Sequence, residues 1–171
     1  MTIDLRNFIR DVPNFPKEGI LFRDIAPLLA NPEAFNYAVD MIAKPWIDEE
    51  IDSIGMLDAR GFIFGTVIAA DLGLPFFMIR KEGKLPPPVL LEQYSLEYGG
   101  GCITISPDAV KPKDRVLLVD DVLATGGTAS AAARLITKNG GEVLGLATLA
   151  ELSYCEGRKV FKYPITSCLV Y

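Results

Sequence analysis

The sequence predicts an α/β fold in which a mostly parallel central sheet is flanked by helices. Three observations support this prediction. Short apolar runs that suit buried strands alternate with helical patterns, no segment repeats itself, and the turns between the segments are short. Ligands of such a sheet bind beyond the carboxyl ends of its strands, so polar residues at those ends are the first candidates for a site.

The first regular elements are a helix and a strand. Asn31 is a good N-cap and Pro32 suits the first helical position, so a helix begins there and runs to about residue 42. Residues 51–57 (IDSIGML) are an apolar run of the length of a buried strand.

The middle of the chain continues this alternation. Residues 58–73 (DARGFIFGTVIAADLG) form a loop and a helix that Gly73 ends, and residues 74–80 (LPFFMIR) form the next strand. The stretch from Lys81 to Ser106 contains three consecutive prolines and three consecutive glycines. This composition is typical of a long loop plus an antiparallel ribbon that projects from the body.

The last elements follow the same order. Residues 115–119 (RVLLV) form a third core strand, and a helix with one apolar face runs from Thr128 to Lys138. Asn139-Gly140-Gly141 ends that helix, and residues 142–150 (EVLGLATLA) form a fourth strand. We expect residues 1–171 to form one domain.

Composition excludes several classes of function. The net charge of −5 gives the molecule no field that attracts nucleic acid or an acidic membrane surface. No apolar stretch reaches about 18 residues and no signal peptide is visible, so we expect a soluble, cytoplasmic protein with its three cysteines reduced. The chain has no histidine, which excludes imidazole zinc sites and serine–histidine triads. Carboxylates, lysine or tyrosine must therefore carry any acid–base chemistry.

Residues 117–130 (LLVDDVLATGGTAS) carry the strongest chemical signal. Asp120 and Asp121 fall where the third strand ends, and the residues ATGGT fall where the next helix begins. Backbone N–H groups at a glycine-rich helix start can wrap a phosphate, and the neighbouring threonine hydroxyls add donors. The loop is neither a Walker A sequence, since GK[ST] is missing, nor a GxGxxG fingerprint.

The two carboxylates narrow the choice of ligand. They would repel a phosphate unless they bind another group, and ribose hydroxyls or a hydrated Mg²⁺ are the natural candidates. The pattern therefore indicates a ribose 5-phosphate. The alternative is an ordinary strand-to-helix turn with a capping aspartate, but a cap uses one carboxylate and has no need of Thr-Gly-Gly-Thr.

The stretch VLLVDDVLATGGT resembles the 5-phosphoribosyl 1-pyrophosphate (PRPP) signature of the type I phosphoribosyltransferases. Its Leu-Ala-Thr-Gly-Gly-Thr variant is similar to that of the adenine-specific branch of the family. Further motifs of that branch follow in order and spacing along nearly the whole chain: NFPKEGILFRDIAPLL (14–29), LDARGFIFG (57–65), IRKEGKLP (79–86) and YSLEYG (94–99).

This resemblance implies a type I phosphoribosyltransferase fold with a small N-terminal hood, a base-binding segment at about 1–45 and a mobile lid loop at about 81–106. It implies that the 5′-phosphate is bound by Ala124, Thr125, Gly126, Gly127 and Thr128, and that Asp120 and Asp121 face the ribose hydroxyls and Mg²⁺.

Pyrophosphate binding is implied for Arg60, Lys81 and Lys84. A planar guanidinium suits two oxygens at once. The alternatives are an Arg60 paired with Asp58 or Asp71 and two ordinary loop lysines. Whether Arg80 points to the site stays open.

Adenine binding is implied for Leu21, Phe22 and Arg23, with Phe22 against the purine ring and Val122 on its opposite face. From the residues alone, Phe22 equally suits a core aromatic.

Glu97 on the lid is the implied catalytic acid–base, because burial in a closing site raises the pKa of a carboxyl towards neutrality. Tyr98 would order the lid or help the proton transfer. Without the resemblance, Glu97 would be read as a solvated ribbon residue, and Glu92 is the nearby comparison.

The implied reaction is displacement of pyrophosphate from C1′ of PRPP by N9 of adenine, giving AMP. Mg²⁺ would be held mainly through PRPP and water, without a dedicated protein cage. The resemblance also implies a homodimer acting on small molecules, with no nucleic acid or membrane partner. Two alternatives remain: another purine base as substrate (guanine, hypoxanthine or xanthine), or a PRPP-binding regulator without catalysis, which would normally need a DNA-binding module.

Overall fold

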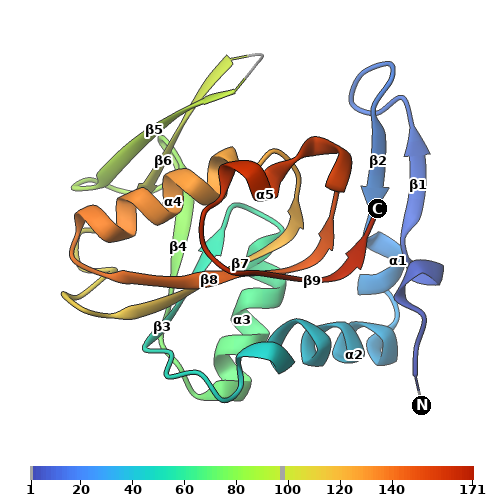
Figure 1. Cartoon of the computed structure of the whole chain (residues 1–171), viewed down its shortest axis with the longest axis horizontal. Coiled ribbons are helices and arrows are strands. Elements are labelled where there is room, and N and C mark those ends of the chain that lie inside the picture. The colour runs from blue at the N-terminus through green and yellow to red at the C-terminus, as the bar shows by residue number, and fades with distance from the viewer. Residues whose placement is uncertain (1, 97–98) are drawn as a thin grey trace. The chain divides into compact units, whose positions relative to one another are not determined.

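The computed structural model describes residues 2–96 and 99–171 (Figure 1). The chain divides into two compact units, Met1–Met41 and Ile42–Tyr171. The expectation of one domain over residues 1–171 stays a prediction.

The first unit contains a hairpin that the sequence did not predict. Strands β1 (Arg10–Pro13) and β2 (Leu21–Asp24) pair antiparallel, with Arg10 opposite Asp24 and Val12 opposite Phe22. Ion pairs Arg10–Asp24 and Arg23–Asp11 join the two strands across the hairpin. The unit also contains a 3₁₀ turn η1 (Leu5–Phe8) and helix α1 (Ala26–Leu29).

Helix α2 (Pro32–Ala43) begins as predicted from the sequence. The backbone N–H of Ala34 donates to Oδ1 of Asn31 at 2.9 Å, which is the expected N-cap contact. A 3₁₀ turn, η2 (Lys44–Trp46), follows directly.

The second unit is built on a seven-stranded sheet with the order β5-β6-β4-β3-β7-β8-β9. Strands β3, β4, β7, β8 and β9 are parallel, whereas β6 pairs antiparallel with both β4 and β5. The predicted mostly parallel sheet with an antiparallel ribbon is therefore confirmed. The strand bounds are β3 Ser53–Leu57, β4 Phe76–Lys81, β5 Leu90–Leu96, β6 Gly99–Ile105, β7 Arg115–Leu123, β8 Glu142–Glu151 and β9 Ile165–Val170.

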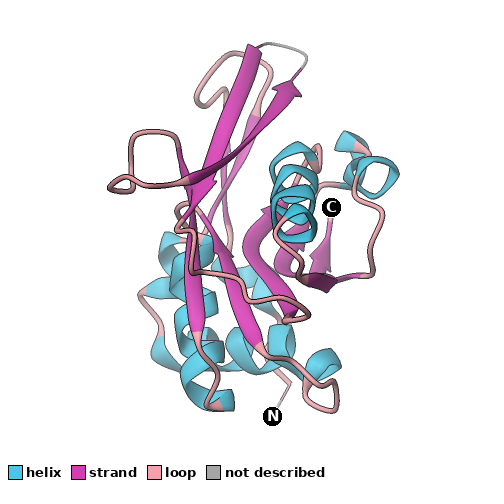
Figure 2. Ribbon diagram, turned by 90° about the vertical axis from the view of Figure 1, so that its left-hand side faces the viewer, coloured by secondary structure: helices cyan, strands magenta, loops and turns pink. Residues whose placement is uncertain are grey.

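The ribbon is the outer edge of this sheet. Only Arg80 and Lys81 of β4 pair with β6, through Thr104 and Ile103, whereas β5 and β6 pair along their whole length. The outer parts of β5 and β6 therefore extend beyond the rest of the sheet (Figure 2).

Helices cover both faces of the sheet. Helix α3 (Gly61–Leu72) packs against β3 and β7 on one face, and α4 (Gly127–Lys138) packs against β5 and β8 on the other (Figure 1). As expected, α3 ends at Gly73, which is left-handed at φ 67°. Two short elements complete the unit, the 3₁₀ turn η3 (Ser153–Cys155) and helix α5 (Gly157–Val160).

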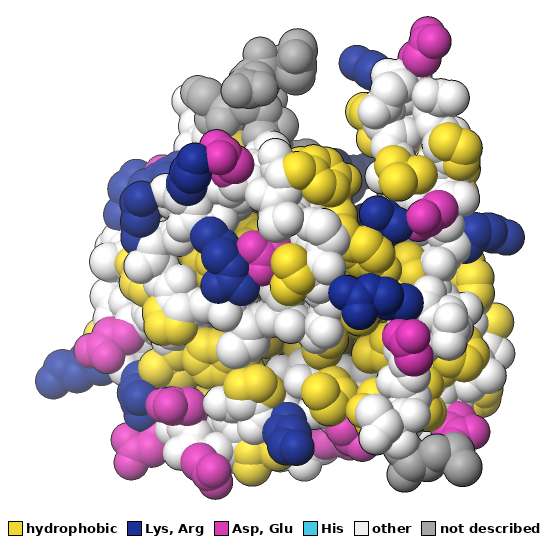
Figure 3. All heavy atoms as spheres, turned by 45° about the vertical axis from the view of Figure 1, so that its right-hand side comes forward, with side chains coloured by type: hydrophobic (Ala, Val, Ile, Leu, Met, Phe, Trp, Pro, Cys, Tyr) yellow, Lys and Arg dark blue, Asp and Glu magenta, His cyan; other side chains and the backbone are white. Residues whose placement is uncertain are grey.

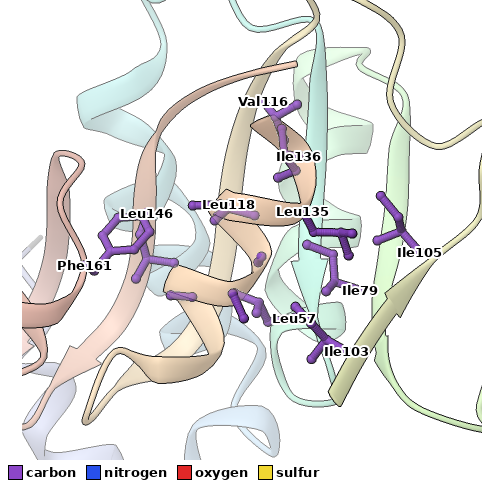
Figure 4. Packing of buried hydrophobic residues seen from close by; sticks show 14 of the residues in the cluster. Leu57, Ile79, Ile103, Ile105, Val116, Leu118, Leu135, Ile136, Leu146 and Phe161 are labelled. Carbon is purple, nitrogen blue, oxygen red and sulfur yellow. The ribbon is translucent and has the colours of Figure 1, made fainter. Parts of the chain in front are cut away.

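The apolar face of α4 forms the centre of the core (Figure 4). Leu135 and Ile136 are 2% and 0% exposed and lie against strand residues such as Leu57, Ile79 and Leu118. Burying a leucine or isoleucine side chain contributes about 1.5–3 kcal/mol. This packing fixes α4, and with it the loop from which the helix begins.

The predicted strand boundaries differ from the observed ones by at most two residues, except at the end of β7. Strand β7 runs to Leu123 instead of ending at Val119, so Asp120 and Asp121 lie inside the strand. The reason is the length of β8, whose Thr148 and Ala150 pair with Asp120 and Val122. The apolar run at 115–119 could not reveal that the polar residues after it continue the strand by pairing with β8.

Surface and composition bear on the expected partners. Within the two described ranges, none of the helices combines the length and the apolar character that crossing a membrane requires. On the face drawn in Figure 3, Lys and Arg side chains are interspersed with Asp and Glu. The cysteines Cys102, Cys155 and Cys168 are free thiols.

Candidate active site

The loop between β7 and α4 has the geometry of an anion site. Gly126 stands at the N-cap of α4 with φ 76°, a left-handed conformation that glycine adopts without strain, and no side chain in the described part of the chain caps the helix. The first N–H groups of α4 therefore remain to be satisfied by a ligand or by water. The loop borders a small cavity of about 100 Å³, lined by Asp120, Val122, Leu123, Ala124, Thr125, Gly126, Gly127, Thr128, Ala129 and Leu146.

Asp120 and Asp121 take different places beside this loop. Asp120 lines the cavity, whereas Asp121 is buried and its Oδ2 lies 2.8 Å from Nε of Arg60. The backbone N–H of Asp121 also donates to Oδ1 of Asp120 at 2.8 Å. The two carboxylates are thus neighbours, and Asp121 forms an ion pair with the Arg60 guanidinium.

Burial shapes the charge of this pair. Burial raises the pKa of Asp120 well above its ordinary value, and the negative charge of Asp121 raises it further. Burial also raises the pKa of Asp121, although the Arg60 guanidinium opposes the shift. Such a pair gains stability from hydroxyl donors or a cation close by.

Arg60 comes from the loop that connects β3 to α3, directly before the first residue of the helix. It pairs with Asp121, whereas Asp58 pairs with Arg80. The ion pair joins the carboxyl end of β3 to β7, the strand beside it in the sheet. The alternative partners of Arg60 considered from the sequence were Asp58 and Asp71, but not Asp121.

Arg80 flanks the loop after β4. Its Nε lies 3.2 Å from Oδ2 of Asp58, and its guanidinium stands 5.5 Å from the centre of the Phe62 ring. Lys81 and Lys84 are exposed at the same end of β4. Because β3, β4 and β7 are parallel, Arg60, both lysines and the loop between β7 and α4 all lie at carboxyl ends of strands.

The predicted base-binding residues fall in both units. Leu21, Phe22 and Arg23 lie on β2, and the Phe22 ring meets Phe15 edge-on at 5.2 Å between centroids. Val122 lies on β7 and lines the loop cavity of the second unit. Their joint role at one base stays a prediction.

The predicted catalytic residue Glu97 and the lid residue Tyr98 lie outside the described residues. The ribbon is described on either side of them, with Leu96 opposite Gly99.

The comparison residue Glu92 turns out to be a structural one. It is buried on β5, where Nε of Arg134 donates to Oε1 at 2.7 Å and Lys138 donates to Oε2. Both cations lie on α4, so only the paired elements, and no sequence motif, could have revealed the cluster.

A larger groove of about 670 Å³ lies at the other end of the sheet. Ser53 and Phe76, which line it, stand at the first positions of β3 and β4. Ligands of parallel sheets bind at the carboxyl ends of the strands, so the smaller cavity beside the loop between β7 and α4 is the better candidate.

Metal binding by protein ligands alone finds no support among residues 2–96 and 99–171. No three Asp, Glu or Cys side chains gather there in a way that could hold an ion. Two neighbouring carboxylates do suit Mg²⁺ when substrate oxygens and water complete its octahedral shell.

Comparison with known proteins agrees with this geometry. The phosphoribosyl transferase domain family matches residues 31–169. The curated adenine phosphoribosyltransferase of Thermotoga petrophila is 52% identical to this chain, over 99% of the chain and 100% of its own length.

Solved structures give the same picture. The adenine phosphoribosyltransferase of Rhodothermus marinus is 44% identical with a TM-score of 0.93, over 98% of this chain and 96% of its own. The Saccharomyces cerevisiae enzyme, solved with D-2,5-dideoxy-2,5-imino-altritol 1,6-bisphosphate and adenine, is 35% identical with a TM-score of 0.89, over 95% of each chain.

Proposed function

Because the chain belongs to the adenine phosphoribosyltransferase family, we infer that it transfers the 5-phosphoribosyl group from PRPP to N9 of adenine, giving AMP and pyrophosphate. The observation that carries this function is identity of 52% to a curated enzyme of that activity, over 99% of the chain. The chain is thus a glycosyltransferase of purine salvage. The comparisons lend no support to a regulator without catalysis or to another purine base.

We propose that Ala124, Thr125, Gly126, Gly127 and Thr128 bind the 5′-phosphate of PRPP. The uncapped start of α4 supplies backbone donors, and the left-handed Gly126 turns the chain around the anion. Binding energy at this remote phosphate holds the ribose in place for reaction at C1′.

The ribose hydroxyls are assigned to Asp120 and Asp121. Burial raises the pKa of both carboxyls, because their charges are poorly solvated inside the protein. Hydrogen bonds donated by the ribose hydroxyls would stabilise these charges. Asp120 and Asp121 would stand beside a Mg²⁺ ion held mainly through PRPP and water, and the ion would neutralise charge on the diphosphate.

Pyrophosphate is assigned to Arg60, Lys81 and Lys84. Negative charge grows on the leaving group as the bond to C1′ breaks, and fixed cations at the carboxyl ends of the strands stabilise that charge. Arg60 already stands beside Asp121, which holds its guanidinium near the ribose pair.

Adenine is assigned to Leu21, Phe22 and Arg23 on one side and Val122 on the other. Glu97 would exchange the proton at the purine, and Tyr98 would order the lid around it, because a closed lid keeps water from reacting in place of the base. These roles rest on the family and on the chemistry of the residues.

A homodimer and a cytoplasmic location are the remaining proposals. Phe76 and Met78 on β4 are 49% and 42% exposed, an apolar surface that a second copy would cover. Three free thiols suit a reducing compartment. Light scattering on the purified protein decides the first proposal, and a mass of one chain would contradict it.

The test of function is product formation from PRPP and Mg²⁺ with adenine, guanine, hypoxanthine or xanthine supplied separately. AMP formed selectively is the expected result. A different nucleotide would overturn the base assignment, and no nucleotide at all would overturn the enzyme.

A further inference from the structure

The phosphate loop rests against a short turn from the end of the chain, residues 152–161, called here the support turn. The turn contains η3 and α5 and connects β8 with the approach to β9. Its first residue is fixed to the loop's own strand, because the backbone N–H of Leu152 donates to the carbonyl of Leu123 at 2.9 Å. Its last residue, Phe161, is buried in the core.

Loop and turn meet backbone to backbone at two glycines. A Cβ atom at position 157 would lie 2.2 Å from the carbonyl oxygen of Ala124, and one at Gly126 would lie 2.7 Å from the carbonyl oxygen of Gly157. Both distances are well inside van der Waals contact. Gly157 does not need a left-handed backbone, so the requirement at this position is space alone.

An ion pair between the exposed Arg158 and the buried Glu151 ties the turn to the sheet. Nε of Arg158 donates to both carboxylate oxygens of Glu151, at 2.8 and 2.9 Å, and Nη2 donates to Oε2 at 2.7 Å. Glu151 is buried at the end of β8, while Nη1 of Arg158 reaches the carbonyl of Ile165 at 3.4 Å. The residue next to Gly157 is therefore anchored to the sheet.

We propose that Gly157, anchored through the Glu151–Arg158 pair, is a positioning residue that sets the shape of the loop binding the 5′-phosphate of PRPP. Since both ends of the support turn are fixed, a side chain at position 157 displaces Ala124 rather than the turn. The proposal rests on the proposed function only for the identity of the phosphate ligand.

The test compares Gly157→Ala with Gly141→Ala. The control position is also crowded, because a Cβ atom there would lie 2.6 Å from Cγ1 of Val110 and 2.8 Å from Cγ2 of Ile136, but it follows the far end of α4. Isothermal titration gives the Kd of each folded variant for ribose 5-phosphate and for pyrophosphate, with the thermal midpoint recorded alongside.

For Gly157→Ala we expect about a tenfold or larger rise in the Kd for ribose 5-phosphate, because displacing Ala124 moves the loop N–H groups that donate to the charged phosphate. The Kd for pyrophosphate should not change. Gly141→Ala should lower the thermal midpoint and leave both Kd values unchanged. Unchanged ribose 5-phosphate binding in Gly157→Ala, or parallel losses for both ligands, overturns the proposal.

A second pair of variants serves if Gly157→Ala does not fold. Arg158→Gln should weaken ribose 5-phosphate binding severalfold, and Arg158→Lys should restore part of it. Equal binding in wild type and Arg158→Gln contradicts the role of the anchor. If the wild type forms no AMP, the proposed function is wrong. The titrations with ribose 5-phosphate would still show whether Gly157 sets the shape of the loop.

Discussion

At the scale of single residues, the contact between Asp121 and Arg60 links two proposed functions. The buried carboxylate stands 2.8 Å from a guanidinium assigned to pyrophosphate. The side chain of Asp121 would therefore serve the proposed ribose site and also orient a cation of the proposed pyrophosphate site. A substitution at either residue should be felt at both parts of PRPP.

Asp121→Asn is expected to weaken PRPP binding about tenfold or more. The substitution removes a charge that holds Arg60, and breaking a hydrogen bond to a charged group is worth about 1.5–3 kcal/mol. A PRPP titration measures the loss. Asp48→Asn on the surface is the matched control, and an unaltered titration for Asp121→Asn would count against the ribose assignment.

Glu97→Gln is expected to lower kcat by about a hundredfold or more, with little effect on PRPP binding, because general acid–base catalysis contributes factors of about 10²–10⁴. Steady-state kinetics with PRPP titrated separately makes the distinction. Glu92 cannot be the control, since it is buried and ion-paired. The exposed Glu142 replaces it, and a wild-type kcat for Glu97→Gln removes Glu97 from the chemistry.

The loop between β7 and α4 could be proposed as a phosphate site from the sequence, because an apolar strand, two acids and a glycine-rich helix start are adjacent there. The roles of its residues stay a prediction. The partner of Arg60 could not be predicted, since the ion pair forms only where β3 and β7 lie side by side. The burial of Glu92 escaped prediction for the same reason, as its cations lie on a helix far along the chain.

At the scale of elements, Glu92 ties the ribbon to the helix that begins at the phosphate loop. Arg134 holds Glu92 and also donates from Nη2 to the carbonyl of Gln93 at 3.2 Å. The root of the proposed lid and the proposed phosphate site therefore share α4. A change at this anchor should loosen the ribbon without touching a ligand.

The stability of this anchor should depend on pH. Hydrogen bonds from Arg134 and Lys138 hold the pKa of Glu92 below its ordinary value of 4.5. A carboxyl whose pKa is lower in the folded state than in the unfolded state stabilises the fold at pH values above its unfolded-state pKa. That stabilisation is lost as the pH falls through the folded-state pKa. Glu92→Gln should therefore reduce the free energy of unfolding at pH 7 by about 1–3 kcal/mol.

Urea unfolding of wild type and Glu92→Gln between pH 7 and pH 3 checks this expectation. The gap between the two proteins should narrow as the solution becomes more acidic than pH 4.5. A gap that stays constant across the range would show that the charge of Glu92 is not what stabilises the ribbon.

Elements with strong end signals were predicted well, and weakly marked ones were not. Asn31 and Gly73 mark the start of α2 and the end of α3 in sequence and structure alike. The β1–β2 hairpin carries no comparable signal, because its short strands are rich in charge and are joined by cross-strand ion pairs such as Arg10–Asp24. Such a segment forms a strand only when it pairs with a partner strand.

At the scale of the whole molecule, the proposed tasks are divided between the units. The phosphate loop, the aspartate pair and Arg60 all belong to Ile42–Tyr171, whereas Leu21, Phe22 and Arg23 belong to Met1–Met41. Binding of ribose 5-phosphate and recognition of adenine should therefore respond to different substitutions.

Phe22→Ala is expected to raise the KM for adenine about tenfold, since stacking of a base on an aromatic ring is worth about 1–3 kcal/mol. The Kd for ribose 5-phosphate should not change. Leu29→Ala, which alters an exposed residue of the same unit, is the control. A parallel rise in the Kd for ribose 5-phosphate would contradict the division.

The class of fold followed from alternating strand and helix patterns, because those patterns reflect burial on both faces of a parallel sheet. The order of the strands in the sheet could not be predicted from the sequence, since it depends on which strands pair with one another in the folded chain. The division at Met41 was equally invisible, as it falls inside α2, where the helical pattern continues without a break.

The uncapped start of α4 has a consequence for the life of the protein in a cell. Bound phosphate would satisfy helix donors that no described side chain caps, so the native state would be completed by its own substrate. Ligand at a hundred times its Kd adds about 2.7 kcal/mol to the resistance against unfolding. The concentration of PRPP would then influence how fast the protein is degraded, in addition to its catalytic rate.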